Sequence, residues 1–238
     1  MRRFHLILTG LSLNIILLSL NRLTEFTQGY LQPFEFLRWL DFNAMLPIPL
    51  LSVLLYYLLR KEVLYDSPFS KSTLYIILAL IFIAGVYFFG AGSGDHEVTN
   101  YLNSRFCQAG RVDSPICNII SFNDDQFSHY VYYLGFVLLN ISLMFLEHFY
   151  PRKDSVFKID LILIVANSLF IAAGIFANLA FEEAVIDLVV FSSVMILALY
   201  LLIFTQRKLT WLPVTFYFAL SYTLGVLATL LYKLSNLF

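Results

Sequence analysis

Seven long apolar runs divide this chain of 238 residues, and they restrict its fold more than any other feature. A helix rises about 1.5 Å per residue, so about 20 apolar residues cross the hydrocarbon layer of a membrane, which is about 30 Å thick. Of all residues, 60% are hydrophobic and only 13% are charged, a balance far from that of soluble domains. The sequence therefore predicts an all-α, polytopic membrane helix bundle, with residues 1–238 forming a single transmembrane helical domain.

The predicted spans lie at residues 4–20, 44–60, 73–91, 129–147, 158–180, 184–205 and 210–232. The first two are the shortest, and the second contains Pro47 and Pro49, which a kink or neighbouring helices must accommodate. A bundle of six spans is therefore the alternative to the seven-span interpretation.

The connection at residues 22–43 is amphipathic, with Pro33 followed by several aromatic residues and Trp39. Proline suits a first helical turn and tryptophan suits the headgroup region of a membrane, so we expect a short interfacial helix here. Its simplest role is anchoring, and a lid over an outer site is the alternative.

Lysine and arginine residues indicate the orientation, because cytoplasmic connections carry an excess of them. With a cytoplasmic N-terminus, ten lie inside and five lie outside. The inner ones are Arg2, Arg3, Arg60, Lys61, Lys71, Arg152, Lys153, Lys158, Arg207 and Lys208, and the outer ones are Arg22, Arg38, Arg105, Arg111 and Lys233. This bias predicts an N-in, C-out integral protein with an odd number of spans, in a plasma or inner membrane.

The charges also restrict the partners. Lys and Arg number 15 against 16 Asp and Glu, and no basic patch lies away from the predicted helix ends. This balance argues against a nucleic-acid partner, which requires a basic surface. The lipid bilayer is the expected partner.

Two polar arms flank the connection between the third and fourth predicted spans, and both are predicted to lie outside the cytoplasm. One contains Asp95, His96 and Glu97, and the other contains Asp125 and His129. Asp125 and His129 are four residues apart, so on a helix their side chains share a face. We therefore expect the two arms to bring two histidines and several carboxylates together.

Both cysteines, Cys107 and Cys117, lie between these arms. The predicted topology places them in an oxidising compartment, where a disulfide between them would fasten the arms together. A metal site is the weaker interpretation of this pair, because the chain has neither a CxxC spacing nor a neighbouring histidine here.

Further carboxylates are predicted at the same membrane face, at the turn between the fifth and sixth spans and just after it. Acidic residues commonly flank spans and favour helix N-termini, so many of them need no functional explanation. On this interpretation Asp95, Asp124, Glu183 and Asp187 lie in water just outside the bilayer.

The remaining outer residues are typical of a metal site. Imidazole and carboxylate ligands bind catalytic zinc and related metals, which keep a position open for water or substrate. We predict His96, His129 and Asp125 as ligands of a divalent metal, with zinc as the first candidate, and Glu97 or Glu182 as general base or fourth ligand. The predicted function is a metal-dependent hydrolase acting on a lipid or small hydrophobic substrate.

In outline, seven spans with a histidine and carboxylate site resemble the seven-span membrane hydrolase superfamily that includes alkaline ceramidases and adiponectin-receptor-like proteins. Those families carry an HxxxH pair in their last span, whereas residues 210–232 contain no histidine. Membership is therefore not inferred, and neither is a ceramide-like substrate.

Polar stripes on the fourth and fifth spans favour a different function. We expect Asp125, His129, Asn140 and Glu147 to face Asp160, Asn167, Asn178 and Glu182. Facing stripes could line the path of a proton- or ion-coupled transporter, although hydrogen bonding between helices explains them equally. A non-catalytic membrane scaffold is the third alternative.

Small residues elsewhere in the spans have simple structural interpretations. We expect Gly85, Gly90 and Gly92 to allow close helix packing, and hydroxyls such as those of Ser221 and Thr229 to bond to their own helix backbone.

Overall fold

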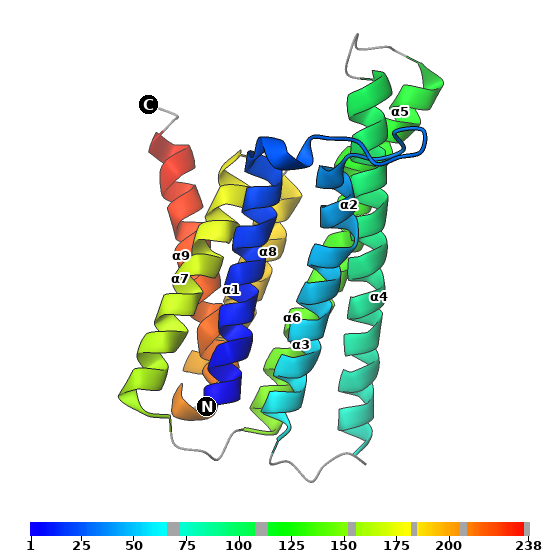
Figure 1. The fold of residues 1–238 in the computed structure, drawn as a ribbon. Coiled ribbons are helices and arrows are strands. Elements are labelled where there is room, and N and C mark those ends of the chain that lie inside the picture. The colour runs from blue at the N-terminus through cyan, green and yellow to red at the C-terminus, as the bar shows by residue number, and fades with distance from the viewer. Residues whose placement is uncertain (66–71, 108–113, 152–155, 182–184, 205–208, 236–238) are drawn as a thin grey trace. The chain divides into compact units, whose positions relative to one another are not determined.

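The computed structural model describes residues 1–65, 72–107, 114–151, 156–181, 185–204 and 209–235 (Figure 1). The described residues are helical and contain no strand, and seven helical segments are long and apolar enough to cross a membrane. These segments are Arg2–Leu23, Trp39–Val63, Thr73–Cys107, Pro115–Phe149, Lys158–Ala180, Ile186–Ile203 and Pro213–Ser235. The predicted membrane bundle with seven spans is confirmed, and the N-in, C-out orientation stays a prediction.

Contacts between residues divide the chain into two compact units. Unit 1 comprises Met1–Ile15, Leu55–Phe82 and Asn140–Phe238, and unit 2 comprises Ile16–Leu54 and Ile83–Leu139. Several long helices begin in one unit and end in the other.

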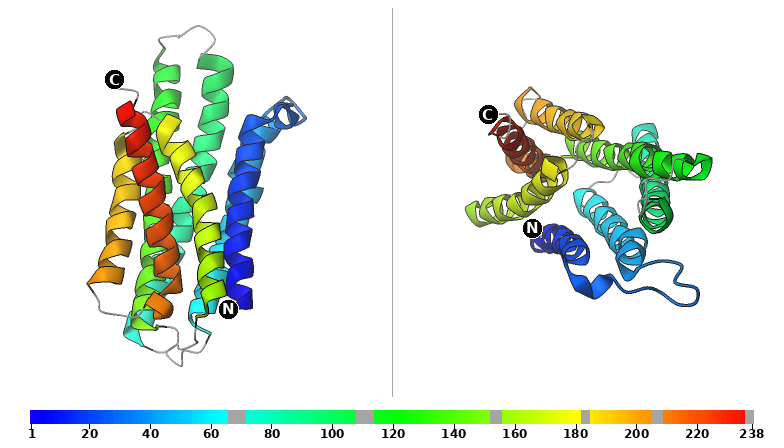
Figure 2. Two further views of the ribbon diagram at one scale, coloured as in Figure 1. Left: turned by 90° about the vertical axis from the view of Figure 1, so that its left-hand side faces the viewer. Right: turned by 90° about the horizontal axis from the view of Figure 1, so that it is seen from above.

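The last three spans belong to unit 1. They are helices α7 (Lys158–Phe181), α8 (Val185–Ile203) and α9 (Pro213–Ser235), and a 3₁₀ turn, η4 (Leu209–Trp211), precedes α9. Figure 2 shows α9 beside both α7 and α8, and α9 packs against each of them. Proline is favourable at the first position of a helix, which suits the start of α9.

The second span begins earlier than expected. The short helix predicted after the first span is α2 (Trp39–Met45), which runs through Leu46 directly into α3 (Pro47–Val63). Pro47 and Pro49 lie in the first turn of α3, where a missing N–H costs no intrahelical hydrogen bond. Neither proline therefore requires a kink within the helix.

The two polar arms are helical and extend the third and fourth spans. Helix α4 (Thr73–Leu102) continues into the π-helix η2 (Asn103–Cys107), and α5 (Pro115–Phe122) passes through the π-helix η3 (Asn123–Phe127) into α6 (Ser128–Phe149). Each segment has 35 residues. At about 1.5 Å per residue such a helix is about 50 Å long, well beyond the hydrocarbon thickness of about 30 Å.

The polar stripe predicted on the fifth span faces the first helix, α1 (Arg2–Leu23), within unit 1. His5 Nε2 lies 2.7 Å from Asp160 Oδ1, and Ser12 Oγ donates to Asn167 Oδ1 at 2.8 Å. Further along, a Cβ at Gly174 would lie 2.7 Å from Ile15 Cγ2. The shared face was predicted correctly, but the expectation that it faces the fourth span is wrong for Asp160 and Asn167.

Glu147, at the end of the fourth span, binds the start of α9. Its carboxylate accepts hydrogen bonds from the N–H groups of Val214 at 2.8 Å and Thr215 at 2.7 Å, and from Thr215 Oγ1 at 2.8 Å. The first N–H groups of a helix lack intrahelical partners and carry a partial positive charge. Glu147, which is 1% exposed, therefore acts as an N-terminal cap from another helix.

Candidate functional site

The candidate site lies in unit 2, where α4 and α6 pack backbone to backbone. A Cβ at Gly92 would lie 2.3 Å from Tyr132 N, and a Cβ at Gly135 would lie 2.1 Å from Phe89 N. Only glycine permits such an approach. Close packing, predicted for the glycines of the third span, is confirmed for Gly85 and Gly92, whereas a Cβ at Gly90 would meet nothing within 4 Å.

The two histidines of the arms meet one helical turn beyond this contact. The ring centroids of His96 and His129 are 4.8 Å apart, with an angle of 75° between the ring planes. Tyr133 contacts the other side of His129, edge to face, with centroids 5.9 Å apart. The close packing of α4 and α6 thus brings the two predicted ligands together.

Asp124 is the acidic residue beside His96. His96 Nδ1 forms its hydrogen bond with the backbone oxygen of Asp124, at 3.3 Å, and also lies 3.3 Å from Asp124 Oδ1. Asp124 Oδ2 accepts a hydrogen bond from Asn103 Nδ2 at 2.9 Å. Ser128 Oγ donates to the backbone oxygen of Asp124 at 2.8 Å. Asp124 is only 4% exposed, so the expectation that it lies in water is wrong.

The other acids of the expected outer group differ in placement. Asp187, in unit 1, is 0% exposed, which also contradicts the expectation of a water-exposed residue. Asp125, predicted as a metal ligand, is exposed, and Asp95 is half-buried. Glu182 and Glu183 lie outside the described residues.

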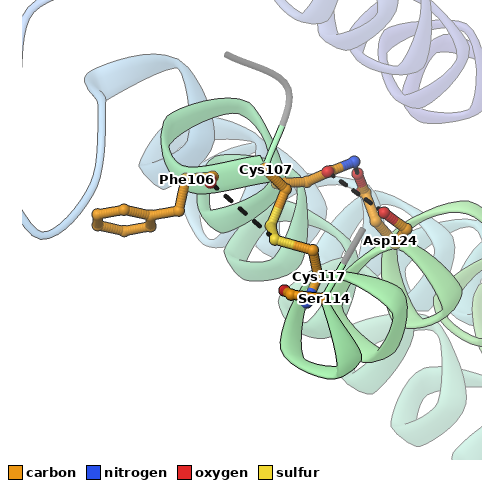
Figure 3. Close-up of a disulfide and its surroundings, with 7 residues drawn as sticks. Phe106, Cys107, Ser114, Cys117 and Asp124 are labelled. Carbon is orange, nitrogen blue, oxygen red and sulfur yellow. Dashed lines mark hydrogen bonds between the residues drawn. A yellow bond between two sulfur atoms is a disulfide. The ribbon is translucent and has the colours of Figure 1, made fainter. Parts of the chain in front are cut away.

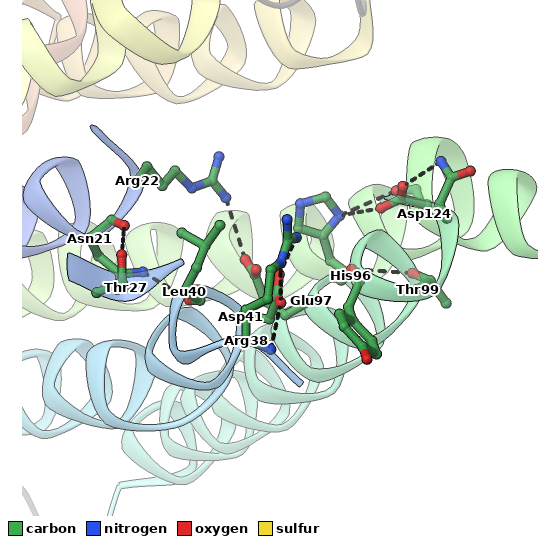
Figure 4. Close-up of polar contacts among 12 residues, drawn as sticks. Asn21, Arg22, Thr27, Arg38, Leu40, Asp41, His96, Glu97, Thr99 and Asp124 are labelled. Atoms are coloured by element: carbon green, nitrogen blue, oxygen red, sulfur yellow. Dashed lines mark hydrogen bonds and ion pairs between the residues drawn. The ribbon is translucent and has the colours of Figure 1, made fainter. Parts of the chain in front are cut away.

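Glu97, predicted as a general base or ligand, is 4% exposed and forms an ion pair with a helix end. Its Oε1 accepts from Arg22 Nη2 at 3.4 Å, and the Arg22 side chain is 46% exposed. Figure 4 shows Glu97 between Arg22 and the Arg38–Asp41 pair. To act as a base or a ligand, Glu97 would first have to exchange its contact with Arg22.

A second ion pair fixes the start of α2. Asp41, which is 0% exposed, accepts two hydrogen bonds from the Arg38 guanidinium, both at 2.8 Å, and one from the Arg38 N–H at 3.1 Å. This hydrogen bonding raises the pKa of Arg38 above its ordinary value. A buried, bidentate pair of this kind has a defined geometry, which a solvated surface pair lacks.

The loop between α1 and α2 is fastened to the end of α4. The Glu35 backbone oxygen accepts from Tyr101 Oη and from the Arg105 guanidinium, and Arg105 Nη2 lies 3.2 Å from Glu35 Oε2. The Arg105 guanidinium also lies 5.5 Å from the centroid of the Tyr30 ring. These contacts hold the loop against α4 and η2, and both the anchoring role in the membrane interface and the lid role stay predictions.

A disulfide closes the tip of the two arms (Figure 3). Cys107 at the end of η2 is bonded to Cys117 in α5, with 5.6 Å between their Cα atoms. Ser114 caps α5 by accepting the Cys117 N–H at 3.1 Å. The predicted pairing is confirmed, and both arms are covalently held beyond the histidines.

The described residues contain no group of three or more His, Cys, Asp or Glu side chains that could hold a metal ion. The structure brings His96 and His129 together with Asp124, whereas the prediction named Asp125 as the third member. The predicted metal set therefore stays a prediction.

Sequence reasoning missed three residues of this site, Asn103, Asp124 and Arg22. Asn103 is seven residues after His96, two helical turns along one face, and this spacing could have revealed it. The pairing of Arg22 with Glu97 joins helices far apart in the sequence, and no local pattern indicates it.

No protein-family model matches the chain, and comparisons with curated proteins and with solved structures found no match.

Proposed function

We propose that this protein is a membrane-embedded enzyme, a hydrolase acting on a lipid or another hydrophobic substrate, with His96 as its acid–base group. The pairing of His96 Nδ1 with the buried carboxylate of Asp124, at 3.3 Å, carries this proposal. Histidine is the side chain most often used to transfer protons near neutral pH. The backbone oxygen of Asp124 accepts from Nδ1 and its carboxylate lies beside the same nitrogen, which orients the imidazole and leaves Nε2 to act.

The step that this arrangement supports is the hydrolysis of an ester or amide. His96 Nε2 accepts a proton from water while the water oxygen adds to the carbonyl carbon, and the imidazolium then returns the proton to the leaving group. Asp124 stabilises the positive charge that His96 carries between the two transfers. Asn103 holds Asp124 at 2.9 Å and so acts as a positioning residue.

His129 and Glu97 have supporting roles in this proposal. The His129 ring packs against His96 with centroids 4.8 Å apart, which restricts the orientation of the His96 ring. Glu97 and Arg22 hold the end of α1 beside the site through their contact at 3.4 Å. Substrates that dissolve in lipid can reach a centre carried on membrane-spanning helices without leaving the bilayer.

A divalent metal is an alternative use of His96, because a ring nitrogen that binds a metal cannot also accept a proton. With His96 Nδ1 engaged by Asp124, Nε2 of His96 and the imidazole of His129 are nitrogens of the kind that zinc binds. A carboxylate would complete the set, and the sequence prediction names Asp125 with Glu97 or Glu182. Such a metal would activate water and stabilise the developing oxyanion.

The transporter alternative has less support from the geometry. It depends on polar stripes that face each other, and Asp160, Asn167 and Glu147 instead bond to α1 and α9. Hydrogen bonding between helices is a sufficient explanation of these side chains.

The test of the enzyme proposal uses purified protein in nanodiscs of a mixed polar lipid extract, in water enriched with ¹⁸O. We expect one lipid class to be cleaved, with ¹⁸O in the released acid. His96→Gln should lower the rate about 100-fold, because general acid–base catalysis contributes about 100-fold or more. Gln126→Ala, which changes an exposed residue of η3, is the matched control and should leave the rate unchanged.

Two results of this assay contradict the enzyme proposal. In the first, His96→Gln cleaves lipid as fast as the wild type, and in the second, none of the lipid classes supplied is cleaved. Elemental analysis tests the metal separately: one equivalent of zinc in the wild type, lost in both His96→Gln and His129→Gln, supports it. A metal-free protein that cleaves lipid would exclude the metal and keep the acid–base mechanism.

A further inference from the structure

A cluster of buried tyrosine hydroxyls belongs to unit 1, whereas the histidine site belongs to unit 2. Asn140 of α6 is 0% exposed, and its Oδ1 accepts from Tyr56 Oη of α3 and from Tyr222 Oη of α9, each at 3.3 Å. Asn140 is nine residues from Phe149, the nearer end of α6, and Tyr222 is nine residues from Pro213, the nearer end of α9. The cluster therefore lies about 14 Å from these helix ends, well inside the spans.

Tyr217 adds a hydroxyl to this region. Its side chain is 1% exposed, and its hydroxyl has no hydrogen-bond partner among the described residues. The aromatic rings are contiguous, since Phe218 contacts Tyr217 at 5.5 Å, Tyr56 at 6.4 Å and Tyr222 at 6.0 Å between centroids.

Ser221 repeats this pattern one helical turn further along α9. It is 0% exposed, and its hydroxyl has no hydrogen-bond partner in the described part of the chain. The expectation that it bonds to its own helix backbone is therefore wrong, whereas Thr229 does so, donating to the Gly225 oxygen at 2.9 Å. Two buried hydroxyls on one face of α9 thus have no hydrogen-bond partner among the residues that the structure describes.

We propose that α3, α6 and α9 enclose an internal hydration site, in which ordered water bonds to the Tyr217 hydroxyl and connects it to the Tyr56–Asn140–Tyr222 cluster. A buried hydroxyl without a partner is costly, because it has given up its hydrogen bonds to bulk water. Buried waters in proteins typically make about three hydrogen bonds to such groups. The cluster offers the donors and acceptors required, since each tyrosine hydroxyl both donates and accepts.

The site does not depend on the proposed enzyme. Its residues belong to unit 1 and none of them is in the histidine site, so the two proposals can fail separately. Ionisable and polar groups within a membrane are expensive, and a bound water reduces this cost without another side chain.

Tyr217→Phe is the decisive variant, because it removes the hydroxyl and keeps the ring. Where water is bound, the variant leaves that water without one partner, and the midpoint of thermal unfolding should fall by about 2–4 °C for a chain of this size. Tyr200→Phe is the matched control, because Tyr200 lies on α8 and is 55% exposed. Its midpoint should not change.

Water itself is the probe in the second measurement. With ¹³Cζ-labelled tyrosine in nanodiscs, NMR polarisation transfer from water should reach Tyr217, and Asn140→Leu should weaken it. An unchanged or higher midpoint in Tyr217→Phe overturns the proposal, because the hydroxyl is then unpaired. A lower midpoint without transfer from water to Tyr217 also overturns it, because the hydroxyl then bonds directly to protein.

Discussion

Asn103 and His96 contact one aspartate, Asp124, through different atoms. Asn103 Nδ2 donates to Asp124 Oδ2 at 2.9 Å, while His96 Nδ1 lies 3.3 Å from both the backbone oxygen and the Oδ1 of Asp124. Asn103 and His96 belong to one arm, and Asp124 belongs to the other. The orientation of the His96 ring therefore depends on a residue two turns away from it in its own arm.

Replacing Asn103 by Leu should loosen this arrangement. Asp124 would lose a donor and His96 would lose a fixed partner, so the ¹⁵N chemical shifts of His96 should move toward those of a freely exchanging imidazole. The chain has 4 histidines, so the signals can be assigned from single His→Gln variants. Unchanged His96 shifts in Asn103→Leu, alongside unchanged shifts in the control Gln126→Ala, would show that Asn103 does not position the pair.

Gly135→Ala should be strongly destabilising. The new Cβ would lie 2.1 Å from Phe89 N and 2.6 Å from Phe89 Cα, both backbone atoms, so the two helices must separate. Overpacking of this kind costs about 1–3 kcal/mol or more. Gly90→Ala is the matched control, because its Cβ would meet nothing within 4 Å and alanine is the better helix former by about 1 kcal/mol. Thermal unfolding in detergent measures both, and equal losses in the two variants would contradict the close packing.

The Arg38–Asp41 pair should behave as a unit. Arg38→Met leaves Asp41, which is 0% exposed, as an unpaired buried charge, and we expect a loss of about 3–5 kcal/mol. The double variant Arg38→Met/Asp41→Leu should recover much of this loss, because no buried charge remains. Chemical unfolding of the single and double variants measures the coupling. A double variant as unstable as the sum of the single ones would mean that the two charges are not coupled.

Removing the disulfide should loosen the tip of the arms and leave the rest of the spans intact. The bond joins residues separated by 10 positions, and closing a loop of this length stabilises by about 2–3 kcal/mol. In Cys107→Ser/Cys117→Ser we expect faster amide hydrogen exchange in η2 and α5, without a change in the middle of α4. Two free thiols in the wild-type protein, found by non-reducing mass mapping, would contradict the pairing itself.

The number of spans followed from the sequence because hydropathy reports burial in lipid directly. The helical lengths of the third and fourth spans did not, since the predicted spans cover only residues 73–91 and 129–147. In the structure the helices continue through the polar arms, and α4 and α6 contact each other at Gly92 and Gly135. A hydropathy window does not detect contacts of this kind between helices.

The proximity of His96 and His129 was predictable from the cysteine pair that closes the arms. The choice of Asp124 over Asp125 was not, because neighbouring residues on a helix differ by about 100° in direction. The π-helix at Asn123–Phe127 changes the phase of that turn, so an α-helical spacing rule does not indicate which of the two aspartates lies beside His96.

Glu147 gives the sharpest test of how unit 1 is held together. Its two carboxylate oxygens accept three hydrogen bonds at the start of α9. The donors are the backbone N–H groups of Val214 and Thr215 and the Thr215 hydroxyl. Glu147→Gln keeps one acceptor oxygen but removes the charge that opposes the helix dipole, so we expect a loss of about 1–2 kcal/mol. Glu147→Leu removes every acceptor and leaves two buried N–H groups unpaired, which should cost more than the glutamine variant. Hydrogen exchange at Val214 and Thr215 should rise in the same order, and a leucine variant as stable as the wild type would mean that the cap does not hold α9.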